Sequence, residues 1–316
     1  MMSVFTKITP EAAQDIAKSF GLSHVTWLSP ILHGTQNSNY WLTTTEGEFV
    51  LTLVEELDRT VLANIFEFCD YLNQKGIPCL VPLKNKTGDI VAEFQTKPVM
   101  IIQKLLGAQL DSPLVSHAEK VGGLLADLHQ HAATYTGPRL ADSRGKHWRH
   151  VTQQHLTPYL TEQEKKILEK VTPLEMALNW ESLPTGMIHA DLFTDNILWD
   201  DDHISGVLDF FFACEGAYLY DLAILLNDWC FSKQGEFKPE HAEALLTAYL
   251  AKRPLSAEEN AAWHTVCSVA ALRFWLSRRL ALQSPSVPGD VTQKDPLPFL
   301  KIMQFHLEGG VILPAH

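Results

Sequence analysis

The first hundred residues carry short apolar runs of the kind that form β-strands. These runs occur at 25–28, 48–54 and 98–103, and polar turns rich in small residues separate them. Two helical patterns lie among the strands, at 9–21 and 61–76. The first begins with a Thr-Pro pair suited to an N-cap and a first helical position, and each pattern ends at a glycine. This part of the chain therefore predicts short strands with two helices among them.

The pattern changes after Gly107, where apolar residues recur mainly at helical spacing. The predicted helices fall at 117–131, 161–171, 217–229, 239–250 and 264–282. Ser256 and Glu259 form a capping box ahead of the last of them. The remainder of the chain is therefore predicted to be mainly helical, and we place the change of character at residues 104–107.

Composition limits what the chain can be. Its 316 residues suffice for two domains, and 46% hydrophobic with 20% charged residues is typical of a globular protein. The formal net charge of −12 repels phosphate backbones, so nucleic acid is not an expected partner. No apolar stretch reaches 18 residues, so no membrane span is expected. Five cysteines without a C-x-x-C pair, and no signal peptide, indicate a reducing, cytoplasmic compartment.

One stretch combines the groups needed for phosphoryl transfer, and it runs from His189 to Phe210. Asp191 could accept a hydroxyl proton. Asn196 and Asp209 offer oxygen ligands to Mg²⁺, which binds few protein groups and keeps substrate phosphates as others. Three such groups within about twenty residues favour a catalytic site over an ordinary polar loop followed by a surface hairpin.

The spacing of these residues predicts their arrangement. Residues 197–199 and 204–208 have the composition of strands, and the polar segment between them suits a turn. A hairpin folded about Asp202 and His203 would place Asn196 opposite Asp209. Both side chains would then be directed at one ion.

Three other interpretations of the polar residues fail. An EF-hand starting at Asp200 would need oxygen and Gly at its fifth and sixth positions, where the chain has Ile204 and Ser205. A Walker loop is absent from the sequence. His129 and His131 could suggest zinc, but residues two apart on a helix face different ways.

The form His-x-Asp-x-x-x-x-Asn followed by Leu-Asp-Phe resembles the catalytic and metal-binding loops of the protein-kinase-like superfamily. The whole chain resembles the homoserine kinases of the aminoglycoside-phosphotransferase-like branch. The stretches that carry this resemblance are Met2–Thr6, Asn37–Asn39, Phe49–Leu53, His189–Asn196, Tyr220–Cys230 and Arg273–Arg278. It implies an α+β, two-lobed fold with a small antiparallel-sheet N-lobe, 1–103, a hinge, 104–107, and a larger mainly helical C-lobe, 108–316.

The resemblance also implies an activity and its site residues. ATP, with Mg²⁺ on Asn196 and Asp209, would phosphorylate the hydroxyl of L-homoserine, a step of threonine synthesis. Asp191 would be the base, His189 would belong to the catalytic set, and Asp221 would brace the loop. The expected nucleotide contacts come from the hairpin tip and the hinge: Gly34, Asn37, Ser38, Asn39, Gln103 and Leu105.

The sequence departs from the superfamily at Thr52, which stands where a lysine usually pairs with the α- and β-phosphates. This departure is expected in the homoserine kinase branch. Either Lys97 or Lys104 takes the role, or the phosphates rest mainly on Mg²⁺ and backbone groups.

Homoserine carries a carboxylate and an ammonium, so its site needs a cation and an acid or amide. Asn227, Asp228, Arg273 and Arg278 lie in helices that should wall the acceptor side. Arginine suits a carboxylate because its planar fork binds both oxygens. We expect Arg273 to bind the carboxylate, with Arg278 as the substitute, and Asp228 to lie near the ammonium.

Two alternatives remain at this stage. One is another small-molecule kinase of the same fold, acting on an amino alcohol or a sugar. The other is a catalytically silent nucleotide-binding regulator, although a silent relative has no chemical need for Asp191, Asn196 and Asp209 together. The expected partner is a small molecule only, and the chain is expected to be a monomer or a homodimer.

Overall fold

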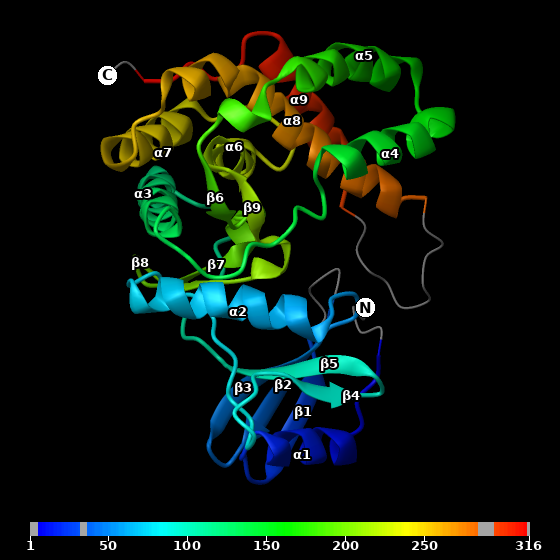
Figure 1. Ribbon diagram of the computed structural model, residues 1–316, viewed down its shortest axis with the longest axis vertical. Helices are drawn as coiled ribbons and strands as arrows, with labels where there is room; N and C mark the ends of the chain where they lie inside the picture. The colour runs from blue at the N-terminus through cyan, green and yellow to red at the C-terminus, as the bar shows by residue number, and fades with distance from the viewer. Residues whose placement is uncertain (1–5, 32–36, 284–293, 315–316) are drawn as a thin grey trace. The chain divides into compact units, whose positions relative to one another are not determined.

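The computed structural model describes residues 6–31, 37–283 and 294–314 and contains two compact units (Figure 1). The described residues of unit 1 are 6–31, 37–73 and 79–106. Those of unit 2 are 74–78, 107–283 and 294–314. Each unit is described by itself below.

Unit 1 is built on a five-stranded antiparallel sheet with the order β1-β2-β3-β5-β4. Its strands are β1 (Val25–Pro30), β2 (Ser38–Thr44), β3 (Gly47–Leu53), β4 (Ala92–Phe94) and β5 (Lys97–Gln103). Its helices are α1 (Pro10–Ser19) and α2 (Arg59–Gln74), and the last residue of α2 already belongs to unit 2. The predicted N-cap of α1 is confirmed, because the Thr9 side chain accepts from the Ala12 N–H at 3.2 Å.

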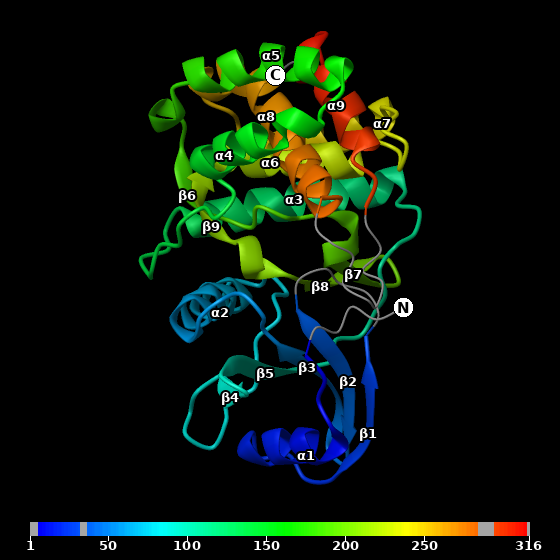
Figure 2. The same ribbon diagram turned by 90° about the vertical axis from the view of Figure 1, so that its right-hand side faces the viewer.

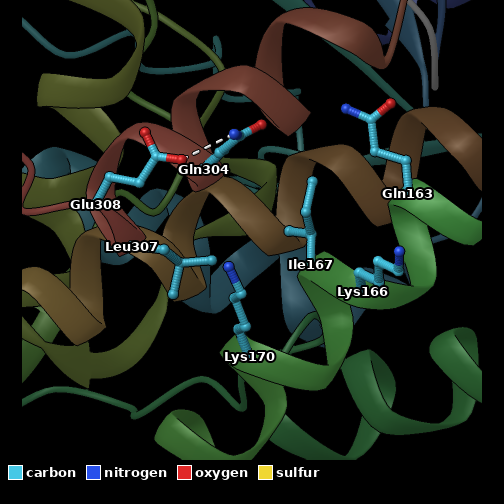
Figure 3. Close-up of a pocket in the computed structure, with 7 residues that line it drawn as sticks. All are labelled: Gln163, Lys166, Ile167, Lys170, Gln304, Leu307 and Glu308. Atoms are coloured by element: carbon cyan, nitrogen blue, oxygen red, sulfur yellow. Dashed lines mark hydrogen bonds between the residues drawn. The ribbon is translucent and has the colours of Figure 1, made fainter.

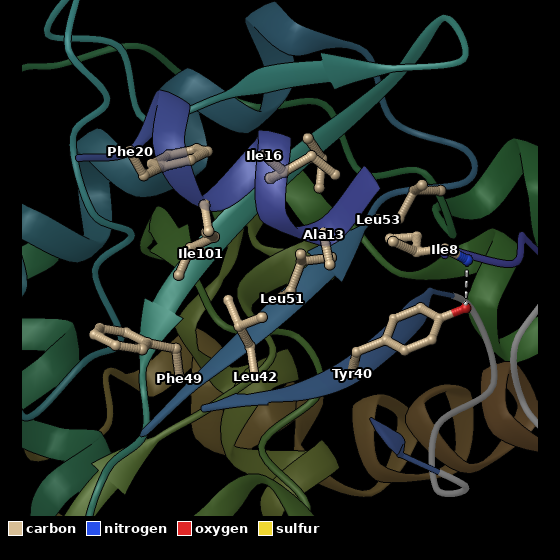
Figure 4. Close-up of a cluster of buried hydrophobic side chains, with 12 residues drawn as sticks. Ile8, Ala13, Ile16, Phe20, Tyr40, Leu42, Phe49, Leu51, Leu53 and Ile101 are labelled. Carbon is tan, nitrogen blue, oxygen red and sulfur yellow. Dashed lines mark hydrogen bonds between the residues drawn. The ribbon is translucent and has the colours of Figure 1, made fainter. Parts of the chain in front are cut away.

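One face of this sheet is covered by α1, and the core of unit 1 lies between them (Figure 4). Leu51 and Leu53 of β3 point into this core, so Thr52 points to the opposite face. The Tyr40 hydroxyl accepts from the Ile8 N–H at 3.1 Å, which attaches the segment before α1 to β2. Strand alternation therefore sets which side chains of unit 1 face α1 and which face away from it.

Unit 2 is mainly helical. Its helices are α3 (Val115–Ala132), α4 (Lys146–Leu156), α5 (Glu162–Ala177), α6 (Tyr218–Trp229), α7 (Pro239–Lys252), α8 (Ala257–Ala281) and α9 (Leu297–Leu307). Helix α6 lies between α3 and α8 and is buried along almost its whole length (Figures 1 and 2). The predicted capping box of α8 is present, because Ser256 and Glu259 each accept from the other's backbone N–H.

Two small ladders of unit 2 hold the predicted catalytic stretch. Strand β6 (Thr185–Ile188) pairs with β9 (Cys214–Ala217), and β7 (Ile197–Asp200) pairs with β8 (His203–Val207). Short 3-10 turns, η3 (Thr194–Asn196) and η4 (Phe210–Phe212), lie between the ladders. Two further 3-10 turns, η1 (Thr157–Tyr159) and η2 (Trp180–Ser182), and short connections complete the described part of the unit.

The chain enters unit 2 at Gly107, whose φ of +103° is a conformation that favours glycine. A Cβ there would lie 2.5 Å from the Trp199 carbonyl oxygen, so no side chain fits. The next residue, Ala108, exchanges two backbone hydrogen bonds of 2.9 Å with Trp199. The start of unit 2 is thereby fixed to β7, the strand that follows the catalytic loop.

Candidate active site

The loop from His189 to Phe193 leaves β6 and turns sharply at Ala190, which has φ of +61°. For an alanine this left-handed conformation costs about 1–2 kcal/mol. Both of its backbone groups are held: Asp221 Oδ1 accepts from the Ala190 N–H at 2.8 Å, and Arg273 Nη1 donates to the Ala190 carbonyl. The position of Asp191 is therefore imposed by its surroundings.

Asp221, on the buried helix α6, accepts three hydrogen bonds. Its Oδ2 accepts from the His189 N–H at 2.9 Å and from His129 Nε2 at 3.1 Å, in addition to the bond from Ala190. Burial alone would raise the pKa of Asp221, but its interactions with His129 and His189 lower it below its usual value. Asp221 is therefore an ionised group inside the protein that holds the catalytic loop.

His189 is fully buried, and both of its ring nitrogens are bonded to the backbone. Nε2 lies 2.8 Å from the Leu208 carbonyl and must donate to it, and Nδ1 accepts from the Asp191 N–H at 3.2 Å. Burial lowers the pKa of His189, so the ring is neutral. His189 was predicted to belong to the catalytic set, and both of its ring nitrogens are bonded to the backbone of the site. His189 positions Asp191 and joins the catalytic loop to the segment before Asp209.

Asn196 and Asp209 lie at the open end of the β7–β8 hairpin, with a different register from the prediction. The turn is centred on Asp201 and Asp202, and a bulge follows at Leu198, so the Asn196 carbonyl accepts from the Leu208 N–H at 2.9 Å. Asn196 is thus opposite Leu208, and Asp209 comes one residue later. Asp209 has φ of +59°, a second strained position of the kind that gathers at functional sites.

The amide of Asn196 is oriented by Asp191. Its Nδ2 donates to the Asp191 carbonyl at 2.7 Å and lies 3.4 Å from Asp191 Oδ2. Because the amide nitrogen faces Asp191, the oxygen Oδ1 is the atom that remains for a cation. Asp191, the candidate general base, and Asn196, a candidate metal ligand, are therefore held next to one another by hydrogen bonds.

The electrostatics of the site fit a divalent cation. Burial raises the pKa of Asp191 well above its usual range; Arg273 opposes this shift, while the charges of Asp209 and Asp195 add to it. Asp209 is exposed by surface area, yet enough protein surrounds its carboxylate that desolvation, together with the charge of Asp195, raises its pKa to about 6. Crowded carboxylates of this kind require positive charge.

Within the described residues no three His, Cys, Asp or Glu side chains form a complete metal site. A carboxylate plus an amide is nonetheless a donor set suited to Mg²⁺, which takes one or two carboxylates and completes its shell with phosphates and water. Asn196 and Asp209 therefore fit an ion that arrives with a nucleotide.

Of the four acceptor candidates, two are committed to the protein interior. Asn227 is buried, with Nδ2 donating to the Cys267 carbonyl at 3.0 Å and Oδ1 2.7 Å from His306 Nε2. Both ends of its amide are used, so the expected contact of Asn227 with an acceptor is not supported. Arg273 is 2% exposed and directs Nη1 at Ala190, beneath the catalytic loop.

Asp228 and Arg278 lie closer to the solvent. Asp228 Oδ2 accepts from the Thr194 N–H at 2.7 Å, and burial raises its pKa. Arg278 is half-buried, donates to the Asp295 carbonyl at 2.8 Å, and has its guanidinium 4.4 Å from the ring centre of Phe299. These two residues offer opposite charges beside the loop that carries Asp191.

Residues 27–255 match the phosphotransferase enzyme family. The chain belongs to that family. Homoserine kinases from Methylobacillus flagellatus and Methylobacillus glycogenes are 40% and 37% identical to it, and each alignment covers 96% of this chain and 95% of the relative. A homoserine kinase from Pseudomonas aeruginosa is 37% identical, with 94% of both chains covered. The resemblance inferred from the sequence is confirmed.

Solved structures agree on the fold of this phosphotransferase. A microcompartment-associated aminopropanol kinase superposes with a TM-score of 0.72 at 18% identity, covering 95% of this chain and 98% of the other. An amicoumacin kinase in complex with AMP-PNP and Ca²⁺ also gives 0.72, at 16% identity, covering 95% and 94%. The expected α+β, two-lobed, protein-kinase-like fold is confirmed.

In the described part of the chain, no helix combines the length and apolar character that a membrane crossing needs.

In unit 1 of the phosphotransferase, the expected nucleotide residues lie at strand ends. Asn37, Ser38 and Asn39 lead into or begin β2, whereas Gly34 lies outside the described residues. Gln103 ends β5 and is exposed, and Leu105 follows in the segment before unit 2. Asn39 Oδ1 accepts from the Thr52 hydroxyl at 2.8 Å.

A recess of unit 2 lies between α5 and α9 (Figure 3). It is lined by Gln163, Lys166, Ile167, Lys170, Gln304, Leu307 and Glu308. None of the predicted site residues lines it. The phosphotransferase chemistry is therefore assigned to the catalytic loop and not to this recess.

Two residues near the site were missed by sequence reasoning. His129 was considered only as a zinc ligand, yet it bonds to Asp221. Lys294 was not considered, yet its Nζ lies 3.0 Å from Asp195 Oδ2 in the catalytic loop. Nothing near Lys294 in the sequence marks it, because the contact joins residues about a hundred positions apart.

Proposed function

We propose that this phosphotransferase is a homoserine kinase that transfers the γ-phosphoryl group of ATP to the side-chain hydroxyl of L-homoserine. The observation that carries the proposal is the match to homoserine kinases at 37–40% identity over nearly the whole chain. The presence of Asp191, Asn196 and Asp209 together supports it against a catalytically silent regulator.

Asp191 is the proposed base. Burial raises its pKa well above the usual range of an aspartate, and its position is fixed by Asn196 and by the hydrogen-bonded backbone of Ala190. In the reaction the acceptor oxygen forms a bond to the γ-phosphorus, and the bond from that phosphorus to the bridging oxygen breaks. ADP leaves with the bonding pair, and the hydroxyl proton passes to the Asp191 carboxylate. Asn196 and Asp209 would hold Mg²⁺, which when bound neutralises charge on the phosphate oxygens.

We assign nucleotide binding to the N-lobe, 1–103, with the hinge at 104–107 and the C-lobe at 108–316. The proposed contacts are those expected from the resemblance: Gly34, Asn37, Ser38, Asn39, Gln103 and Leu105. What supports the described ones is their place at the ends of β2 and β5 and in the segment that follows β5.

For the acceptor, the geometry favours Arg278 over Arg273 as the carboxylate ligand. Arg278 keeps a half-buried guanidinium, while Arg273 is directed at Ala190 from inside the protein. Asp228 is the proposed neighbour of the ammonium, and its charge acts on Arg278. The two charges would bind the two ends of an amino acid and place its hydroxyl near Asp191.

The cytoplasm is the proposed compartment. All five cysteines are buried free thiols. Thiols that persist unpaired are typical of a reducing environment. This supports the compartment that the sequence predicted.

An acceptor panel tests the proposal. ATP consumption is measured with L-homoserine, L-serine, choline, 1-amino-2-propanol and a hexose, at equal concentrations and with Mg²⁺. L-Homoserine should give the highest kcat/KM. Preferential phosphorylation of choline or the amino alcohol would instead identify another kinase of this fold, and no acceptor-dependent turnover at all would favour the regulator.

The role of Asp191 is tested in the same assay. Asp191→Asn should lower kcat about 10²- to 10⁴-fold, which is the usual range for loss of a general base. Binding of Mg²⁺·AMP-PNP should persist, measured by calorimetry. Asp200→Asn, an exposed residue at the end of β7, is the matched control and should leave kcat unchanged. If Asp191→Asn keeps more than about a third of kcat, the base lies elsewhere.

A further inference from the structure

The described part of unit 1 has no lysine or arginine beside Thr52 on its face of the sheet. Thr52 pairs across the sheet with Asn39 and Met100, and its hydroxyl donates to Asn39. The face that carries these residues is opposite to the core under α1. The lysine that the superfamily places here therefore has no direct replacement on this strand.

Lys97 and Lys104, the two lysines expected to replace the missing one, each form an ion pair away from Thr52. Lys97 is two residues from Val99, which faces the α1 core, so it lies on the wrong face. Its amine bonds to Thr6 Oγ1 at 2.8 Å and pairs with Glu55. Lys104 pairs with Glu48 at 2.9 Å, four residues along β3 from Thr52, or about 13 Å at strand spacing. Neither amine is directed at Thr52.

Unit 2 carries a cation beside the reacting groups. Lys294 Nζ lies 3.0 Å from Asp195 Oδ2 and 6.0 Å from the ring centre of Phe193. Phe193 and Asp195 follow Asp191 by two and four residues on the catalytic loop. Burial raises the pKa values of Asp191, Asp209 and Asp228, and the charge of Lys294 opposes each of these shifts.

Among the described residues, two arginines also lie near the loop, and each has another assignment: Arg273 holds Ala190, and Arg278 is proposed to bind the acceptor. Arg273 is buried and directed at the Ala190 carbonyl, and its Nε has no hydrogen-bond partner among the described residues. Arg278 donates to the Asp295 carbonyl and packs on Phe299. Lys294, in contrast, is held by an ion pair whose two side chains are 49% and 51% exposed. Such exposed pairs are weak and exchange readily.

We propose that Lys294 is a catalytic residue that binds the transferred γ-phosphoryl group, and so supplies a lysine to a nucleotide that lacks the usual lysine at the position of Thr52. This inference rests on the proposed kinase function. An ammonium is a compact point charge on a flexible stem, and it suits phosphate oxygens. In the absence of nucleotide, Asp195 keeps the amine next to the loop. When a phosphoryl group with higher charge is present, the amine exchanges Asp195 for it.

The test uses Lys294→Ala and Lys294→Arg in the full chain. Lys301→Ala is the matched control, because Lys301 is also an exposed lysine of the same C-terminal segment, with Nζ 3.1 Å from the Gln234 carbonyl. Lys294→Ala should lower kcat roughly 10- to 100-fold, near the lower end of the loss seen when one donor to a transition-state oxyanion is removed. Lys294→Arg should recover most of that loss, and the control should match the wild type.

A binding measurement separates this role from a structural one. The affinities of Mg²⁺·AMP-PNP and Mg²⁺·ADP are compared by calorimetry, because only the first has a γ-phosphoryl group. Lys294→Ala should reduce the preference for AMP-PNP over ADP several-fold and leave ADP binding unchanged. Equal losses for both nucleotides, or a rise in KM for homoserine alone with kcat retained, would overturn the proposal. Because this measurement needs no acceptor, it stays valid if homoserine proves not to be the substrate.

Discussion

Substitution of Asp221 tests whether this buried carboxylate holds the catalytic loop in its conformation. Three donors end on this buried carboxylate: the N–H groups of His189 and Ala190, and Nε2 of His129. Asp221→Ala would leave all three without a partner, at about 1–3 kcal/mol each. The sum approaches the whole stability of a typical domain, about 5–15 kcal/mol, so this variant is not expected to fold well.

Asp221→Asn is the informative variant. The amide keeps one accepting oxygen, but its NH₂ faces a donor, and the charge is lost. We expect a loss of about 2–4 kcal/mol in the free energy of unfolding, from one unpaired donor and weaker remaining bonds. For a unit of this size that corresponds to a fall in Tm of roughly 5–10 °C. Because Ala190 is then less firmly held in its left-handed conformation, kcat should fall about tenfold or more at temperatures where the variant is folded.

The assay combines thermal unfolding by circular dichroism with kcat measured well below Tm. Asp127→Asn is the control, because Asp127 pairs with Lys252 at the surface of the same unit and such pairs contribute about 0–1 kcal/mol. The pKa of Asp221 is lowered in the folded protein, so its stabilising effect is complete above the ordinary value of 3.8 and is lost only as the pH falls through the lower folded pKa. The stability difference should therefore be constant from about pH 5 to pH 8. If Asp221→Asn matches Asp127→Asn in both Tm and kcat, the bracing argument is wrong.

Two further predictions concern charge at the site. The pKa of Asp209 is raised to about 6, so below that pH a cation must displace a proton from its carboxyl group. The Mg²⁺-dependent gain in AMP-PNP affinity should therefore weaken there by up to about tenfold per pH unit. Asp195→Asn removes a neighbouring negative charge and should move the midpoint of this pH dependence to lower pH. Calorimetry with and without Mg²⁺ checks this, and a gain that is flat from about pH 5 to pH 8 would contradict it. Arg278→Lys should raise KM for homoserine several-fold without changing KM for ATP, whereas Arg273→Lys should mainly lower Tm and kcat, because Arg273 holds Ala190. A rise in KM for homoserine in Arg273→Lys, with kcat and Tm unchanged, would restore the original expectation for that residue.

The parts of the fold that could be predicted from sequence are those with local chemical signals. The helix starts at Thr9 and Ser256 depend on caps that act within three residues, and both are present. The short apolar runs of unit 1 became strands because each buries one face against α1. Strand β9 was not predicted, since its four residues include Glu215 and Gly216 and its stability comes from pairing with distant β6.

In the candidate site, too, local features could be predicted from the sequence and tertiary contacts could not. The types and order of Asp191, Asn196 and Asp209 are visible in the sequence, but the hairpin register is not, because a bulge at Leu198 is a backbone feature without a side-chain signal. Arg273 and Asn227 look alike in the sequence as polar residues among apolar ones. Only tertiary contacts show that both are directed into the protein interior.

The buried partners of Asp221 explain how a strained loop can be kept rigid. His129 of α3 bonds to Asp221 and, through Nδ1, lies 2.7 Å from the Tyr249 hydroxyl of α7. Because a carboxylate can only accept, His129 Nε2 carries the proton, and burial lowers the pKa of the ring so that Nδ1 accepts from Tyr249. Arg253 donates to the same hydroxyl at 3.1 Å and to Glu259 at 2.8 Å.

This chain of polar groups ends at the capping box of α8, where Glu259 also accepts from the Ser256 N–H at 2.9 Å. Every link is a buried or half-buried group with a defined donor and acceptor, so displacing one leaves a neighbour unsatisfied. The left-handed Ala190 is therefore supported by three helices, α3, α6 and α7, and by the start of a fourth. A strain of about 1–2 kcal/mol is small beside the cost of unpairing that network, which is why an alanine can hold a conformation that usually requires glycine.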